Sequence, residues 1–246
     1  MPDLSSLQWV LVEASGALVG LAKTGLPGLG LLFVPLMALA FGAKASTGVL
    51  LPMLNMGDLF AVGWYRRHAD LNHLWRLFPW ALAGLGAGVT FGADLPDAGF
   101  KKMLGFLVLG LLALMIWQEL RRDKDAVPTG WWFHALAGFG AGFTTMVGNA
   151  AGPVMSLYLL SMRLPKNSYI GTSAWFFLAV NLIKVPLQIV FWHNISWTTF
   201  TIDLWTLPAI AVGAGLGLLV VGKIPEKAFK FLVLGMTGIS AILLIL

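Results

Sequence analysis

The residue of this sequence that points most directly to chemistry is a lysine inside an apolar segment. Lys23 lies within the long apolar run 7–42, directly before the stretch 24–28, which contains glycine and proline. A charged side chain is costly in a hydrocarbon environment, so such residues usually have a function. A lysine beside the exposed N–H groups of a broken helix would attract an anion. The alternative is that the break lies near a membrane surface and the ammonium group of Lys23 reaches water.

Two pairs of polar residues are related by a constant offset of 126 positions. The offset aligns Asn55 with Asn181, and Asp58 with Lys184. A buried amide without partners costs about 1–3 kcal/mol, so the two asparagines could bind an anionic substrate, support the breaks, or only link helices by hydrogen bonds. Asp58 and Lys184 could relay protons or form an ion pair between the two parts of the chain. Alternatively, each lies solvated close to a membrane boundary.

Further hydrogen-bonding groups lie at the first break and at a similar one in the apolar run 131–162. Thr24 and Gly25 belong to the first break, and Thr144, Thr145 and Asn149 belong to the second. These groups could contact a substrate or cap the half-helices on either side of each break. The predicted substrate-binding residues are Lys23, Thr24, Gly25, Asn55, Thr144, Thr145, Asn149 and Asn181.

No motif typical of an enzyme accompanies these residues. The sequence has no His-Glu-x-x-His, Walker A or Gly-x-Ser-x-Gly motif, and its four histidines lie near segment ends without the spacing of metal ligands. The absence of cysteine excludes disulfides and thiolate metal sites. We therefore predict that the protein is not an enzyme, has no catalytic residue, and binds neither a metal nor another cofactor.

The composition indicates an integral membrane protein. Hydrophobic residues make up 58% of the 246 residues and charged residues only 11%, whereas a soluble domain has about 25% charged residues. The net charge of +5 comes from basic residues at segment ends, which fits membrane topology better than a nucleic-acid-binding face. The lipid bilayer is therefore an expected partner, and nucleic acid is not.

Eight apolar segments, separated by short polar turns, are expected to form helices. They cover about residues 7–42, 45–65, 74–93, 100–118, 131–162, 168–192, 199–222 and 227–246. The first and fifth are too long for one simple span. Because proline and glycine disfavour continuous helix, each is expected to be two half-helices, arranged as a re-entrant hairpin or as two short spans. Unwound backbone is tolerated at membrane depth only inside protein or along a cavity, so both breaks should face inward.

A short repeated sequence indicates that the chain arose by duplication, since FLVLG at 106–110 recurs at 231–235. The polar stretch 119–130 divides the chain almost in half. We therefore predict a first transmembrane repeat at 1–118, a cytoplasmic linker at 119–130 and a second transmembrane repeat at 131–246.

The basic residues of the loops favour opposite orientations for the two halves. The region 66–76 contains three arginines, whereas its counterpart 193–203 contains neither lysine nor arginine. Since cytoplasmic loops are enriched in basic residues, corresponding loops should lie on opposite sides of the membrane. The expected fold class is an all-α, polytopic transmembrane bundle of two inverted repeats.

The glycine-rich stretches, taken in order, resemble those of the sulfite exporter TauE/SafE family of bacterial membrane permeases. The residues that carry the resemblance are Gly20–Gly30, Val34-Pro35, Ala45–Thr47, the glycines at 138, 140 and 142, Gly148–Pro153 and Ile170–Ser173. The likeness covers nearly the whole chain. It departs at Lys23, Thr24 and Pro27, which occupy a loop where the family commonly has a denser cluster of glycines.

The resemblance implies a secondary transporter of small sulfur-containing anions, such as sulfite or sulfonates, with export as the direction. It also implies a multi-pass protein of the bacterial inner membrane, working by alternating access between the two halves. An anion channel and a non-transporting scaffold or assembly subunit are the alternatives. The sequence leaves the transported anion, the coupling ion and the choice between a monomer and a homo-oligomer open.

Overall fold

Helices make up all the regular structure that the computed structural model gives for residues 4–27, 29, 32–93, 96, 130–229, 231–233 and 235, which are the residues it describes. The longer helices are α1 (Ser6–Thr24), α2 (Phe33–Phe41), α3 (Ala43–Tyr65), α4 (Leu71–Ala93), α6 (Trp131–Gly148), α7 (Gly152–Ser161), α8 (Lys166–Leu187) and α9 (Trp197–Lys223). Two short helices, η2 (Arg66–His68) and η3 (Gln188–Trp192), extend α3 and α8. The prediction of a helical protein is confirmed for these residues.

Three of these helices are long and apolar enough to cross a membrane. They are α3 with η2, α8 with η3, and α9, with 26, 27 and 27 residues respectively. The predicted segments 45–65, 74–93, 168–192 and 199–222 coincide closely with α3, α4, α8 with η3, and α9. Several predicted parts lie outside the described residues: the segment 100–118 with the first FLVLG copy, the linker 119–130 except Gly130, and most of 227–246. The count of eight segments therefore stays a prediction.

Both predicted breaks are confirmed, although the second starts later than expected. α1 ends at Thr24 and α2 begins at Phe33, while α6 ends at Gly148 and α7 begins at Gly152. Asn149 ends α6 because it adopts the left-handed conformation, with φ 55°. Thr144 and Thr145 therefore lie in the last turns of α6 and not in the break itself.

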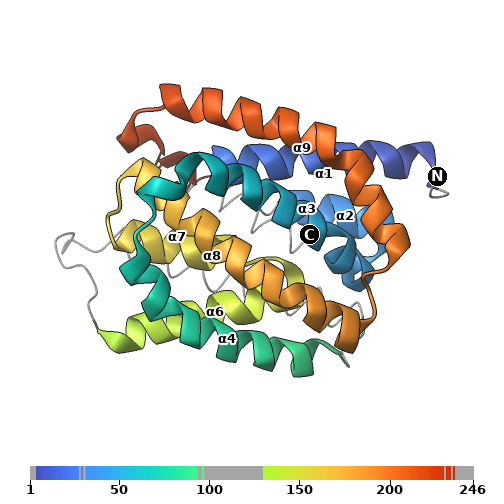
Figure 1. Ribbon diagram of the computed structural model, residues 1–246, viewed down its shortest axis with the longest axis horizontal. Coiled ribbons are helices and arrows are strands. Elements are labelled where there is room, and N and C mark those ends of the chain that lie inside the picture. Colours follow the sequence, from blue (N-terminus) through green and yellow to red (C-terminus); the bar gives the residue numbers. More distant parts are fainter. Residues whose placement is uncertain are drawn as a thin grey trace.

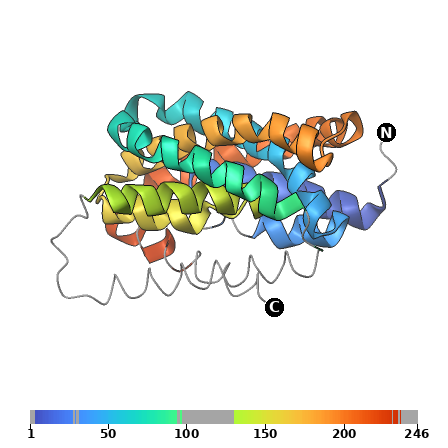
Figure 2. The same cartoon turned by 90° about the horizontal axis from the view of Figure 1, so that it is seen from below.

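The helices are arranged as two outer pairs with two helices between them. α1 lies along α9 at one edge of the bundle, α4 lies along α6 at the opposite edge, and α3 and α8 lie between these pairs (Figure 1). The view turned by 90° shows the helices running lengthwise through the bundle (Figure 2). The short helices pack inside this frame, α2 against α1 and α3, and α7 against α6 and α8. Each broken segment is thus held by one long helix at the edge of the bundle.

Glycines bring the helices of each outer pair into backbone contact. Each of the four helices has two glycines spaced four residues apart: Gly16 and Gly20 in α1, Gly213 and Gly217 in α9, Gly84 and Gly88 in α4, and Gly138 and Gly142 in α6. A Cβ added at Gly20 would overlap the backbone of α9, and one added at Gly142 would overlap that of α4. Such small residues permit close helix packing in membranes. The ends of α1 and α6, where the breaks start, are fixed by these contacts.

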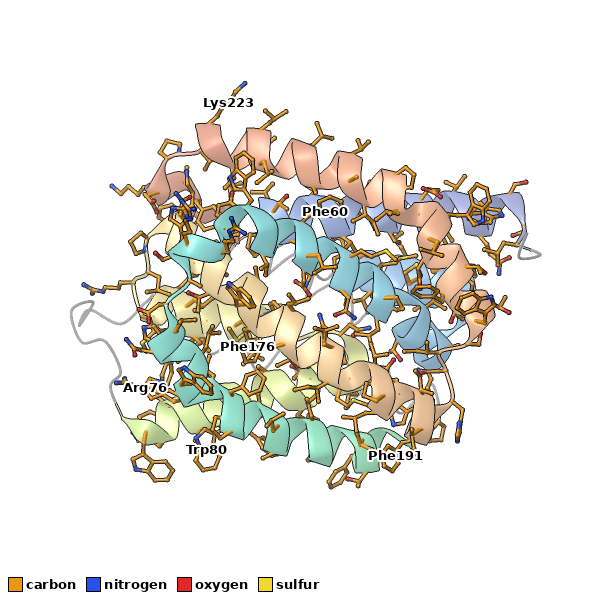
Figure 3. The ribbon with its side chains drawn as sticks, viewed as in Figure 1. Phe60, Arg76, Trp80, Phe176, Phe191 and Lys223 are labelled. Atoms are coloured by element: carbon orange, nitrogen blue, oxygen red, sulfur yellow. The ribbon has the colours of Figure 1, made fainter. Side chains whose placement is uncertain are left out.

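The outer surface of the bundle is apolar, as a lipid environment requires. Trp80 and Phe191 point away from the helices, whereas Phe176 lies between them (Figure 3). The same view places Arg76, near the start of α4, and Lys223, at the end of α9, toward the same end of the bundle.

Candidate functional site

A small cavity of about 50 Å³ lies between the two breaks and α8. The side chains with polar atoms that line it are Lys23, Thr145, Asn149, Ser156, Tyr169, Ser173 and Asn181. A cavity of this volume has room for several water-sized groups, since one such group needs about 10–15 Å³ of it. The end of α1, the end of α6 and the start of α7 thus meet at one cavity, as expected for breaks that face inward.

Lys23 forms an ion pair inside the bundle. Its Nζ lies 2.7 Å from Oδ1 of Asp58, which is fully buried on α3. Asn181 of α8 donates a hydrogen bond of 2.9 Å to the other carboxylate oxygen of Asp58. The ammonium group also lies 4.3 Å from the centre of the Phe177 ring, a cation–π distance. Lys23 therefore points to the interior of the bundle and not to water at its surface.

Lys184 is the second lysine of the site, and it is fully buried. Its Nζ donates hydrogen bonds to Oδ1 of Asn149, at 2.5 Å, and to the hydroxyl of Thr145, at 3.1 Å. Asn149 in turn donates through Nδ2 to the backbone carbonyl of Thr47. Among the described residues, no carboxylate lies within ion-pair distance of Lys184. Lys184 thus holds Thr145 and Asn149, which line the cavity, and it has no carboxylate partner among the described residues.

The offset of 126 positions relates these two contacts to each other. It moves Lys23 and Asp58 onto Asn149 and Lys184. Each pair joins the end of the first half-helix of a broken segment, α1 or α6, to the long helix after that segment, α3 or α8. It also moves Pro27 of the first break onto Pro153, in the first turn of α7. Equivalent positions thus make equivalent contacts in the two parts of the chain.

The helices that carry Asp58 and Lys184 cross in opposite directions. Gly48, near the start of α3, approaches Asn194 after η3, while Gly171, near the start of α8, approaches Tyr65 at the end of α3. The hydrogen bond between Asp58 and Asn181 lies between these two contacts. Asp58 and Lys184 do not form a direct ion pair, since each contacts a residue at the end of a broken helix instead.

Four of the predicted residues, Lys23, Thr145, Asn149 and Asn181, line the cavity together. Thr24 and Gly25 hold α1 against α9 instead. The hydroxyl of Thr24 donates to the carbonyls of Gly20 and Ala214, and a Cβ at Gly25 would overlap the backbone of α9.

Two further predicted residues make contacts within their own helices. The hydroxyl of Thr144 donates to the carbonyl of Ala141, and Nδ2 of Asn55 donates to the carbonyl of Leu51. Neither residue lines the cavity. The repeat-related pair of asparagines is therefore split, with Asn181 at the site and Asn55 away from it.

Sequence reasoning missed part of the cavity wall on α8. Ser173, Phe177 and Asn181 line the cavity at intervals of four residues, which is one face of a helix. Extending the helical spacing backward from Asn181 would have found this face. The same spacing reaches Tyr169, which also lines the cavity; its hydroxyl donates at 2.8 Å to Ser156 of α7, a partner that the spacing does not reveal.

Metal binding has no support in the part of the chain that the structure describes, where no three His, Asp or Glu side chains lie together.

Comparison with known proteins gives one informative result. Neither the curated proteins nor the solved structures give a significant match to this sequence. The profile of the family described as Sulfite exporter TauE/SafE matches residues 13–244, which is nearly the whole chain. The chain therefore belongs to the sulfite exporter TauE/SafE family, a family of membrane transporters of sulfur-containing anions.

Proposed function

We propose that this protein exports a small sulfur-containing anion, such as sulfite or an organosulfonate, by alternating access, and that the anion binds in the cavity between the two breaks. One observation carries the proposal: Lys23 lines a small cavity, and Lys184, which has no carboxylate within ion-pair distance among the described residues, donates to two side chains of the cavity wall. Positive charge in a space with low access to water attracts anions strongly.

Four side chains would contact the anion. Lys23 donates from its ammonium group, and Asn149 and Asn181 each have a second amide N–H besides the one bonded to Thr47 or Asp58. The hydroxyl of Thr145 accepts a hydrogen bond from Lys184 and keeps its own hydrogen to donate. Such donors suit the oxygens of a sulfite or sulfonate group.

The arrangement of the helices supports two inverted repeats that move against each other. The first helix of each half packs along the last described long helix of the other half, as α1 does with α9 and α6 with α4. The equivalent helices α3 and α8 cross in opposite directions. Transporters built from inverted repeats place discontinuous helices around a site near the bilayer midplane, and rocking of the repeats alternates access to it.

The loop charges support one orientation in the membrane. Arg76 and Lys223 lie toward the same end of the bundle (Figure 3), and basic residues favour the cytoplasmic side of a membrane. In this orientation the linker 119–130 is cytoplasmic and the repeats 1–118 and 131–246 span the bacterial inner membrane. We expect transport without catalysis, cofactor or metal.

Efflux from proteoliposomes tests the proposal. Vesicles loaded with sulfite or with methanesulfonate should release the anion when they contain the wild-type protein, and the rate should saturate with concentration. Lys23→Ala should reduce this efflux at least about tenfold, the effect of losing about 1.4 kcal/mol of anion binding. Lys223→Ala, which removes an exposed lysine at the end of α9, is the matched control and should transport normally.

The outcome also separates the alternatives. Anion conductance without saturation would identify a channel. The proposed site would be refuted if anion efflux were equally fast with the wild-type protein, with Lys23→Ala and from protein-free vesicles. The buried polar residues would then have only a structural role.

A further inference from the structure

The buried site contains more positive than negative charge. Its ionisable side chains are Lys23 at the end of α1, Asp58 on α3 and Lys184 on α8. Among the described residues, the charged groups that act on Asp58 are these two lysines, and those that act on Lys184 are Lys23 and Asp58. With both lysines protonated and Asp58 ionised, two ammonium groups share one carboxylate, and the cluster has a net charge of +1.

The surroundings of the cluster give this excess charge an energetic consequence. Asp58 and Lys184 are 0% exposed, and the side chain of Lys23 is 13% exposed. An uncompensated charge is costly in such surroundings, whatever its sign. A ligand with a single negative charge makes the cluster neutral. A ligand with two negative charges leaves it with a net charge of −1.

We propose that the site selects anions with one negative charge over anions of the same size with two. This inference rests on the proposed function, because it concerns the substrate of the same cavity. It identifies the singly charged forms, hydrogen sulfite and organosulfonates, as the bound species, and it places doubly charged sulfite and sulfate among the rejected ones.

Hydrogen bonding alone does not make this distinction. The donors at the cavity, from Lys23, Thr145, Asn149 and Asn181, match tetrahedral oxygens of either charge. Sulfate and methanesulfonate share three such oxygens. They differ in total charge and in one group, which is an oxygen in sulfate and a methyl in methanesulfonate. The charge balance of Lys23, Asp58 and Lys184 adds its own preference, and a substitution that changes this balance separates it from the effect of the methyl group.

Calorimetric titration of the purified wild-type protein with methanesulfonate and with sulfate tests the inference directly. Both anions keep their charges at neutral pH, so protonation of the ligand does not enter. We expect methanesulfonate to bind at least about tenfold more tightly, which corresponds to about 1.4 kcal/mol. Sulfate binding as tightly as methanesulfonate, or more tightly, overturns the inference.

A substitution that changes the charge count provides the second measurement. Asp58→Asn keeps the shape of the side chain and raises the net charge to +2, so it should shift the ratio of the two affinities toward sulfate by at least about tenfold. Asp203→Asn is the matched control, because Asp203 on α9 is also 0% exposed but lies outside the cluster. It should leave the ratio as in the wild type. If Asp58→Asn does not fold, sulfate binding to the wild type as tightly as methanesulfonate still overturns the inference.

Failure of the charge rule is distinguishable from failure of the proposed function. If sulfate matches methanesulfonate while sulfite efflux still depends on Lys23, only the charge rule falls. If neither anion binds and efflux does not depend on Lys23, the proposed function falls with it.

Discussion

Replacing Asn149 by aspartate should supply the counter-ion that Lys184 lacks. In the wild-type protein the amide oxygen of Asn149 accepts a hydrogen bond from the Nζ of Lys184, and its Nδ2 donates to the carbonyl of Thr47. In Asn149→Asp the first contact becomes an ion pair inside the bundle. The same substitution at Asn55, in the middle of α3, adds a charge that no described cationic side chain contacts.

The contacts give the size of the expected difference. With Lys184 protonated, its hydrogen bond to Asn149 already involves a charged group and contributes about 1.5–3 kcal/mol, and a carboxylate in place of the amide adds the attraction between opposite charges. Asn149→Asp also loses the bond to Thr47, which costs about 1 kcal/mol, so its stability should stay within about 1 kcal/mol of the wild type. Asn55→Asp leaves a buried charge unpaired and should cost about 3–5 kcal/mol. Asp58, one turn away on α3, adds like-charge repulsion.

Unfolding by SDS in mixed micelles, followed by the fluorescence of the 11 tryptophans, measures both variants. Asn167→Asp at an exposed position of α8 is the control and should change stability by no more than about 0.5 kcal/mol. Asn149→Asp should also lose binding of methanesulfonate, because the cluster becomes neutral without a ligand. Equal destabilisation by Asn149→Asp and Asn55→Asp would refute the reasoning, since the two positions would then offer a new charge the same surroundings.

Two further predictions concern packing and buried hydrogen bonds, and both are measured by the same unfolding assay. Gly213→Ala should destabilise by about 1–3 kcal/mol because its Cβ would overlap the backbone of α1, whereas Gly215→Ala, with open space at its Cβ, should be neutral or stabilising; equal effects would refute the close contact. Tyr158→Phe should cost about 1–3 kcal/mol, because the Tyr158 hydroxyl contacts Nδ1 of His73 at 2.7 Å and Nδ1 of His134 at 2.9 Å. An unchanged stability would contradict that bridging role.

The breaks could be predicted from sequence because their causes are local. Pro27 and the glycines around it interrupt a helix whatever surrounds them, and the left-handed conformation of Asn149 is one that asparagine adopts readily. The apolar segments could also be predicted, since length and hydropathy define a membrane helix. These features need no knowledge of which helix lies beside which.

The roles of the polar residues at the breaks could not be predicted, because they depend on neighbouring helices. Thr24 and Lys23 are adjacent in sequence, but they point to different neighbours. The hydroxyl of Thr24 bonds to α9, whereas Lys23 reaches Asp58 and the cavity. Gly25 looks like part of a binding loop, yet its lack of a side chain permits contact with Gly217. The packing of α1 along α9 is what shows that Thr24 and Gly25 contact α9 whereas Lys23 faces the cavity.

The charge of the site follows from a difference between two equivalent contacts. In the first half a lysine at the break meets an aspartate on the next helix, so the pair is neutral. In the second half Asn149 at the break meets Lys184 on α8, so the pair is positive when the lysine is protonated. A protein with the first type of contact in both halves would have a neutral centre and no reason to bind an anion. With Lys184 protonated, the second contact keeps the geometry of the first without its negative charge, and the proposed anion would balance the positive charge beside the cavity.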